Sequence, residues 1–249
     1  MPVNVLILCA GHGTRLSPLT DTLPKALLPL SESETILVRL IRQFQSFVPI
    51  PNIWVNISAH SQVFLEYLST LSKQARPKIL LEPQLLGAAN TIFEISKFID
   101  GPLLVVHGDL VLSKEYVIEL VQEIETVPRF YVVCHFRSQD RARSQITTQD
   151  SNCVIEFKNS RDLKVDHSPV LVNSGIYFFP DINDIGVRPG FGTEIADSIL
   201  QYLIARKKLY ALKLELKRLS VDSHKQLQEA KKMVINERLA QGGFQIQTN

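Results

Sequence analysis

The sequence predicts an α/β fold built around a mainly parallel sheet. Up to about residue 126, short apolar runs alternate with amphipathic stretches at helical spacing, which is typical of βαβ units. Within this part, Leu103–Val106 are four consecutive aliphatic residues, the pattern of a strand that is covered on both faces. Beyond residue 130 the candidate strands follow one another more closely. They either extend the same sheet in antiparallel fashion or form a small subdomain.

The first half of the chain shows the alternation most clearly. Val3–Leu8 is a run of β-branched and leucine residues that ends at Gly11 and Gly13, which predicts a buried strand leading into a tight loop. Thr35–Phe47 carries apolar residues on one helical face. The other elements expected here are strands at 53–57 and 78–81, helices at 61–71 and 90–98, and, after 103–106, a helix that Ser113 caps.

The second half predicts more strands than helices. The expected strands are 130–136, 153–157, 170–179 and 209–214, and the expected helices are 193–205 and 223–234. The sequence contains no internal repeat and no linker, so we expect a single domain over residues 1–236. Residues 237–249, which include Gly242 and Gly243, are expected to form a flexible tail.

The composition excludes several classes of protein. With 45% hydrophobic and 21% charged residues, the chain is typical of globular proteins. Its 27 basic and 25 acidic residues give a net charge of +2, which argues against nucleic acid or an anionic membrane as a partner. Three distant cysteines indicate neither a disulfide framework nor a zinc site. Without a secretory signal or a run of membrane-spanning length, we expect a cytoplasmic protein, and a homo-oligomer stays open.

Residues 8–16 (LCAGHGTRL), followed by a Pro-Lys pair that ends at Lys25, carry the most information about function. Glycines after a strand let the backbone approach a bound group, and their N–H groups can line an anion-binding concavity. Arg15 adds a fork of donors for phosphate oxygens, and Lys25 adds a compact positive charge. Such glycines are also common in ordinary turns. No complete G-x-G-x-x-G or G-x-x-x-x-G-K-[ST] motif occurs, however, so the usual dinucleotide and P-loop sites are excluded.

Two aspartates follow predicted strands and are candidate magnesium ligands. Asp109 comes directly after the aliphatic strand 103–106 and the pair His107-Gly108. Magnesium takes few protein carboxylates and keeps phosphates and waters as its other ligands, so this placement is chemically suitable. An aspartate that only turns the chain is the alternative. Asp222 precedes a helix, but Ser223 and Gln226 form a capping box by themselves, which leaves Asp222 free for another role.

Taken together, residues 8–25 resemble the N-terminal signature of the sugar-phosphate nucleotidylyltransferases, L-A-[AG]-G-x-G-T-R-L-x-P-L-T-x-x-x-P-K. Cys9 stands where that family usually has alanine, one small residue for another. The resemblance implies a three-layer α/β/α fold with a Rossmann-like mixed sheet, as in the nucleotide-diphospho-sugar transferase superfamily. It also implies dependence on Mg²⁺. The residues that it places around the nucleotide are Ala10, Gly11, Gly13 and Thr14, with Arg15 and Lys25 as catalytic cations on the phosphates.

The resemblance extends to later segments. Asp109 and Asp222 match the two metal-binding aspartates of the family, and Asp109 counts among its catalytic residues. The Gly-Thr-Pro type turn that usually follows the second aspartate is absent, and this shorter segment resembles that of the phosphocholine cytidylyltransferases.

Further motifs imply contacts to the base and the acceptor. Glu82 and Gly87 fall in the segment that contacts the nucleobase, and a carboxylate there would select a base edge with N–H donors, which leaves the base open. Val172-Asn173-Ser174-Gly175 resembles the strand whose Asn contacts the sugar. Lys158 is the candidate for the acceptor phosphate, with an ordinary solvated lysine as the alternative.

The sequence therefore predicts a nucleotidylyltransferase that joins a nucleoside triphosphate to a sugar 1-phosphate and releases pyrophosphate. One alternative is a cytidylyltransferase for phosphocholine or a similar phosphorylated alcohol, which would need clustered aromatic side chains. The aromatic residues weighed for that role are Trp54, Tyr67, Tyr177 and Phe191. The other alternative is a nucleotide-sensing subunit that keeps the fold without catalysis.

Overall fold

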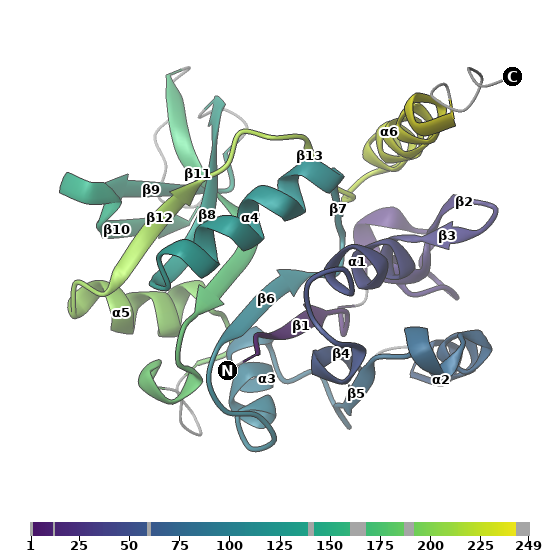
Figure 1. Ribbon diagram of the computed structural model, residues 1–249, viewed down its shortest axis with the longest axis horizontal. Helices are drawn as coiled ribbons and strands as arrows, with labels where there is room; N and C mark the ends of the chain where they lie inside the picture. The colour runs from purple at the N-terminus through teal and green to yellow at the C-terminus, as the bar shows by residue number, and fades with distance from the viewer. Residues whose placement is uncertain are drawn as a thin grey trace, which may run out of the picture.

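The computed structural model describes residues 2–11, 13–58, 61–138, 142–159, 168–186 and 192–242. Its centre is a seven-stranded sheet with the order β12-β8-β11-β6-β1-β4-β5 (Figure 1). The strands of this sheet are β1 (Asn4–Leu8), β4 (Ile53–Ile57), β5 (Lys78–Leu81), β6 (Leu103–His107), β8 (Phe130–Ser138), β11 (Pro169–Phe179) and β12 (Leu209–Lys213).

The sheet is mixed because one strand is reversed. β1 pairs in parallel with β4 and β6, β4 with β5, and β8 with β12, whereas β11 is antiparallel to both of its neighbours, β6 and β8. The strands beyond residue 130 therefore extend the central sheet, which decides between the two arrangements left open by the sequence. β9 (Ser144–Thr148) and β10 (Val154–Asn159) form a separate two-stranded sheet, and β9 had not been expected.

Helices cover both faces of the sheet, so the expected three-layer α/β/α fold is confirmed (Figure 1). Alternate residues of each strand point to opposite faces. Val5 and Ile7 belong to a core shared with α1 (Ile36–Phe44), α2 (Ser61–Thr70), α4 (Lys114–Thr126) and α6 (His224–Gly242). Leu6 between them belongs to a second core shared with α3 (Ala88–Ile95), a π-helical turn at Ala196–Leu200 and α5 (Gln201–Ala205).

Several helices begin where local side chains cap them. Ser113 accepts a hydrogen bond from the backbone N–H of Tyr116 at 3.2 Å, which confirms it as the N-cap of α4. Thr35 caps α1 in the same way through the N–H of Val38. Among the described residues, no helix is both long and apolar enough to cross a membrane.

The C-terminal helix corrects one expectation. Residues 237–242 were expected to belong to a flexible tail, but α6 continues to Gly242. Arg39 explains this extension, because its guanidinium forms an ion pair with Glu237 and donates to the carbonyl of Leu112 at 2.8 Å. A long-range contact of this kind cannot be predicted from the polar composition of the helix end. Residues 243–249 lie outside the described part of the chain.

Candidate active site

One large cavity, of about 710 Å³, opens at the carboxyl ends of β1 and β6. This is the edge at which open α/β sheets bind their ligands, since β1 lies where the chain crosses from one half of the sheet to the other. The segments that line the cavity come from across the sequence: 8–16, 25–26, 85–91, 107–110, 135–144, 157–159, 172–177, 194–196 and 218–226, as far as these residues are described.

The glycine loop forms one side of this cavity. Gly13 has a φ of +68°, which strains any residue with a side chain. Its carbonyl accepts hydrogen bonds from the hydroxyl of Thr20 at 2.8 Å and from the N–H of Leu16 at 2.9 Å, so the loop is held closed. A Cβ on Gly11 would have no atom within 4 Å, which means that this backbone faces open space. Ala10 and Thr14 complete the lining, and His12 lies outside the described residues.

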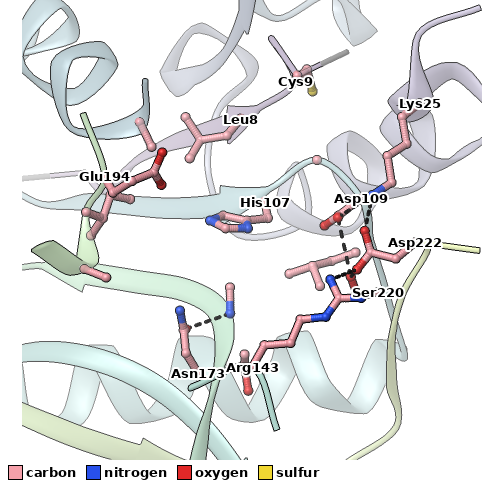
Figure 2. Close-up of a pocket in the computed structure, with 18 of the residues that line it drawn as sticks. Leu8, Cys9, Lys25, His107, Asp109, Arg143, Asn173, Glu194, Ser220 and Asp222 are labelled. Atoms are coloured by element: carbon pink, nitrogen blue, oxygen red, sulfur yellow. Dashed lines mark hydrogen bonds and ion pairs between the residues drawn. The ribbon is translucent and has the colours of Figure 1, made fainter. Parts of the chain in front are cut away.

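Lys25, Asp109 and Asp222 form the polar centre of the site. The Lys25 ammonium lies between the two carboxylates, 2.7 Å from Asp109 and 2.8 Å from Asp222. Arg15 contacts Asp222 at 3.2 Å from the side of the glycine loop. Figure 2 shows these carboxylates pointing toward one another in the cavity. The structure therefore brings the two cations and the two aspartates that the sequence singled out into one place, although 84 residues separate Lys25 from Asp109 and 197 separate it from Asp222.

A short antiparallel ribbon creates this proximity. β7 (Leu110–Leu112) follows Asp109 directly, and β13 (Arg218–Ser220) pairs with it so that Ser220 lies opposite Leu110. The N–H of Val221 donates to the carbonyl of Asp109 at 2.9 Å, which closes the ribbon at the site. The Ser220 hydroxyl also bonds to Asp222 at 3.2 Å. Neither strand was expected from the sequence, because each has only three residues.

Asp222 is held as a carboxylate. Burial alone would raise its pKa, but the hydrogen bond and positive charge of Lys25, together with Arg15 and Arg143, outweigh that effect and lower the pKa. The expected role for Ser223 and Gln226 also fits the geometry. The Ser223 hydroxyl accepts from the Gln226 N–H at 3.3 Å, and the Gln226 side chain accepts from the Asp222 N–H at 2.9 Å, so the helix is capped without the Asp222 carboxylate.

Gly108 fixes the position of Asp109. A Cβ at Gly108 would lie 2.6 Å from the sulfur of Cys9 and 2.6 Å from the carbonyl oxygen of Leu8, so only glycine fits where β6 passes β1. The carbonyl of Leu8 accepts the Gly108 N–H at 2.9 Å. Cys9 is buried, and burial followed by the charge of Asp109 raises its pKa, so this thiol is no nucleophile.

Glu82 lies elsewhere than the sequence suggested. It is only 3% exposed and does not line the cavity. Its carboxylate accepts hydrogen bonds from Asn56 at 2.8 Å and from Thr91 at 2.5 Å. Asn56 in turn accepts the backbone N–H of Cys9 at 2.7 Å. Glu82 therefore supports the start of the glycine loop, and its carboxylate oxygens are occupied inside the protein, which argues against the expected contact to the base.

Lys158 also lies outside the cavity, where it had been expected to contact the acceptor phosphate. It pairs with Glu156 at 2.9 Å on the exposed face of β10 and does not line the cavity, although its neighbours Phe157 and Asn159 do. Side chains alternate along a strand, so this register turns Lys158 away from the acceptor site.

Asn173 and Gly87 do line the cavity, as expected. The Asn173 amide donates to the hydroxyl of Tyr177 at 2.6 Å, and its oxygen accepts the Gly175 N–H at 2.8 Å.

The structure adds site residues that the sequence did not reveal. Arg143 reaches Asp222 at 2.9 Å, because Ser144 anchors the beginning of β9 by accepting the N–H of Asn173 at 3.1 Å. In the sequence Arg137, Arg141 and Arg143 form a basic loop, but nothing local assigned this loop to a site. His107 and Glu194 also point into the cavity (Figure 2). Arg141 of the same loop lies outside the described residues.

The donor set fits magnesium. The described residues contain no cluster of three or more histidine, cysteine or acidic side chains that could hold a metal. Two carboxylates that face open space suit an ion that completes its shell with phosphates and water. The Lys25 ammonium stands between these carboxylates where a divalent cation would balance them, so it acts as a stand-in cation.

Comparison with known proteins identifies the family. The profile of the nucleotidyl transferase family matches residues 4–217, and the chain belongs to this family, which confirms the resemblance seen at residues 8–25. A bifunctional protein GlmU from Methanocaldococcus jannaschii is 25% identical over 85% of this chain and 49% of its own length. A D-glycero-alpha-D-manno-heptose 1-phosphate guanylyltransferase from Campylobacter jejuni is 23% identical over 77% of this chain and 83% of its own.

The fold comparison agrees. A crystal structure described as a putative glucose-1-phosphate thymidylyltransferase from Bacillus anthracis, in complex with a sucrose, superposes with a TM-score of 0.75 at 16% identity, covering 93% of this chain and 94% of the other. This likeness shows a shared fold. The chain spans about half the length of the GlmU proteins that it matches over most of its own length.

Replacing Glu82 should destabilise the protein without changing its choice of base. Glu82→Ala leaves the buried amide of Asn56 without its acceptor, which should lower the free energy of unfolding by about 2 kcal/mol in urea titrations. Gln84→Ala, an exposed position in the same loop, is the matched control. An altered order of binding among the four nucleoside triphosphates, with stability unchanged, would restore the base-reading role.

His135 should make stability fall in mild acid. Burial, followed by the charges of Arg218 and Arg137, lowers the pKa of His135 to about 3. The unfolded chain binds a proton at this position below about pH 6.5 and the folded chain does not, so the free energy of unfolding decreases as pH falls from about 6.5 toward 3. Urea titrations at several pH values should show a shallower decrease for His135→Gln than for the wild type. The same decrease in both proteins, or an equally shallow decrease in the exposed control His224→Gln, would contradict this assignment.

Proposed function

We propose that the chain is a nucleotidylyltransferase that joins the nucleotidyl group of a nucleoside triphosphate to a phosphorylated sugar and releases pyrophosphate. The observation that carries this proposal is the Lys25 ammonium bridging Asp109 and Asp222 next to the glycine loop in one cavity. A glycine-lined backbone, two cations and two carboxylates are what a triphosphate with its metal requires. The names of the relatives support a transferase of this class.

The triphosphate would lie along the glycine loop. Its phosphates would face the exposed backbone at Gly11, and Arg15, whose side chain is 61% exposed, can turn from Asp222 toward them. The base would lie toward Leu85, Gly87 and Ala88 on the same side of the cavity. Because Glu82, Asn56 and Thr91 are occupied by one another, base selection would fall to backbone groups of this wall.

The reaction needs positioning and charge neutralisation more than covalent help from the protein. An oxygen of the acceptor phosphate forms a bond to the α-phosphorus while the bond to the bridging oxygen of the β-phosphate breaks, so pyrophosphate leaves with the bonding electrons. Lys25 would move from the carboxylates to the oxygens of the transferred phosphoryl group, and Arg15 would stabilise pyrophosphate. Asp109 and Asp222 would hold Mg²⁺, which supplies positive charge to the α-phosphate when bound.

The lining favours a sugar over phosphocholine as acceptor. The wall opposite the glycine loop carries groups that suit hydroxyls: Ser144, Asn159, Asn173, Ser174 and Glu194. Of the aromatic residues considered for a choline cage, only Tyr177 lines the cavity. Trp54 packs on Phe98 and Tyr67 approaches Thr35, while Phe191 lies outside the described residues. With Phe157 as the other aromatic lining residue among those described, the cavity offers no cluster around a quaternary ammonium.

We also propose a cytoplasmic location. All three cysteines, Cys9, Cys134 and Cys153, are free and buried, which suits a reducing cytoplasm.

The nucleobase stays open. Among the named relatives, one is a guanylyltransferase and one structure is described as a putative thymidylyltransferase, so the base that this protein uses has to be measured.

Removing one metal-binding carboxylate should abolish turnover without unfolding the protein. Pyrophosphate release is measured for four nucleoside triphosphates against a panel of sugar 1-phosphates and phosphocholine, with Mg²⁺. Asp109→Asn should lose about 10³-fold in kcat/KM for the best pair, because negative charge at the metal is lost. The control Asp184→Asn breaks an exposed lysine–carboxylate pair and should retain activity. Near-normal turnover of Asp109→Asn removes the metal assignment, and wild-type inactivity with every pair favours a nucleotide-sensing protein.

A further inference from the structure

Two arginines in the cavity have no partner among the described residues. Arg218, on β13, is largely buried, and its Nε atom is inaccessible and makes no hydrogen bond. Arg137, on β8, forms neither a hydrogen bond nor an ion pair with any side chain that the structure describes. Buried polar groups in proteins are usually satisfied, and an unpaired buried charge is costly. The unpaired Nε of Arg218 at the cavity wall therefore indicates a ligand that supplies the acceptor atoms, and the exposed guanidinium of Arg137 is open to the same cavity.

Both arginines line the cavity, and they influence each other electrostatically. Burial is the largest cause that lowers the pKa of Arg218; Tyr116 and Asp109 oppose it, and the positive charge of Arg137 lowers the pKa further. Like charges repel, so two unpaired arginines that line one cavity destabilise the empty site. An anion between them would remove that repulsion.

The charge of the whole lining supports an additional anion. The described lining residues include five cations, Arg15, Lys25, Arg137, Arg143 and Arg218, and three carboxylates, Asp109, Glu194 and Asp222. Lys25, Arg15 and Arg143 each contact Asp222, so these three cations have a carboxylate partner within the protein. Arg137 and Arg218 are the described lining cations without such a contact, and they lie on strands away from the glycine loop.

We propose that Arg137 and Arg218 form the subsite that binds the phosphate group of the acceptor. This inference rests on the proposed function, and it names the residues that replace Lys158, which the strand register turns out of the cavity. Guanidinium groups bind phosphate through pairs of parallel hydrogen bonds, so they orient the group as well as attract it. Arg218 lies two residues before Ser220 on β13, and the Ser220 hydroxyl is 3.4 Å from the Asp109 carboxylate, so a phosphate bound at Arg218 would lie near the candidate metal-binding carboxylates and within the same cavity.

Neighbouring polar groups complete the subsite. His135 projects from the same strand as Arg137, and its Nδ1 lies 3.0 Å from the hydroxyl of Ser174. It stays neutral at physiological pH, because burial and the two arginines disfavour its protonation. A neutral imidazole and a hydroxyl can donate hydrogen bonds to a phosphate without adding positive charge. Asn173 and Glu194 line the same cavity, where they would contact the hydroxyl groups of the acceptor.

Steady-state kinetics test this assignment directly. Arg218→Gln and Arg137→Gln should each raise the KM for the sugar phosphate by about tenfold or more, because one charge-assisted pair is lost. The KM for the nucleoside triphosphate should stay within about twofold, since the glycine loop is untouched. Arg218→Lys should recover part of the acceptor affinity, and Arg129→Gln, which removes a cation stacked on Tyr210 outside the cavity, should change neither constant. An increase confined to the triphosphate KM, or no increase, overturns the proposal.

A binding measurement separates this proposal from the proposed function. Isothermal titration with inorganic phosphate is carried out on the wild type, Arg15→Gln, Arg137→Gln and Arg218→Gln. Phosphate should bind to the Arg15 variant as to the wild type and about tenfold more weakly to the other two variants. Weaker binding in the Arg15 variant alone, or equal binding in all four proteins, contradicts the subsite even if the protein is an active transferase. If no substrate pair is turned over, the same titration still decides whether these arginines bind phosphate. Because Arg137 is exposed, its variant retains the fold should Arg218→Gln fail to fold.

Discussion

The site depends on the pair of carboxylates that shares the Lys25 ammonium. Two negative charges this close repel each other, so a cation between them is needed for both to stay ionised. The ammonium lies 2.7 and 2.8 Å from them and meets that need. The same requirement would suit a divalent ion, and Lys25 would then be free to contact the substrate. The ion pairs of Lys25 and the proposed magnesium site thus have the same cause, the repulsion between the carboxylates of Asp109 and Asp222.

The rest of the fold holds that pair in place. Gly108 allows β6 to pass close to β1, so Asp109 leaves the sheet next to the glycine loop. The ribbon of β7 and β13 returns Asp222 to the same point and carries Arg218 into the cavity. Glu82 supports the loop from behind through Asn56, and β9 delivers Arg143. Residues without any part in chemistry therefore decide whether the charged groups meet.

The sequence predicted the fold and the centre of the site well, because these depend on local patterns. Aliphatic runs and helical spacing located the central strands, and the motif at residues 8–25 with Asp109 and Asp222 identified groups that share one cavity. Predictions failed where position depends on register or distant partners. Lys158 is turned outward by the alternation of β10, Glu82 is occupied by Asn56 and Thr91, and the end of α6 is held by Arg39. Three-residue strands such as β7 and β13 leave no periodic signal at all.

The most direct test of this account is a crystal structure with a non-hydrolysable nucleoside triphosphate analogue and Mn²⁺, whose anomalous scattering locates the metal. The account predicts a metal peak between the carboxylates of Asp109 and Asp222, with the Lys25 ammonium moved onto a phosphate oxygen and the phosphates along the glycine loop. A metal bound elsewhere, or a Lys25 that still bridges both carboxylates while the nucleotide is bound, would contradict it.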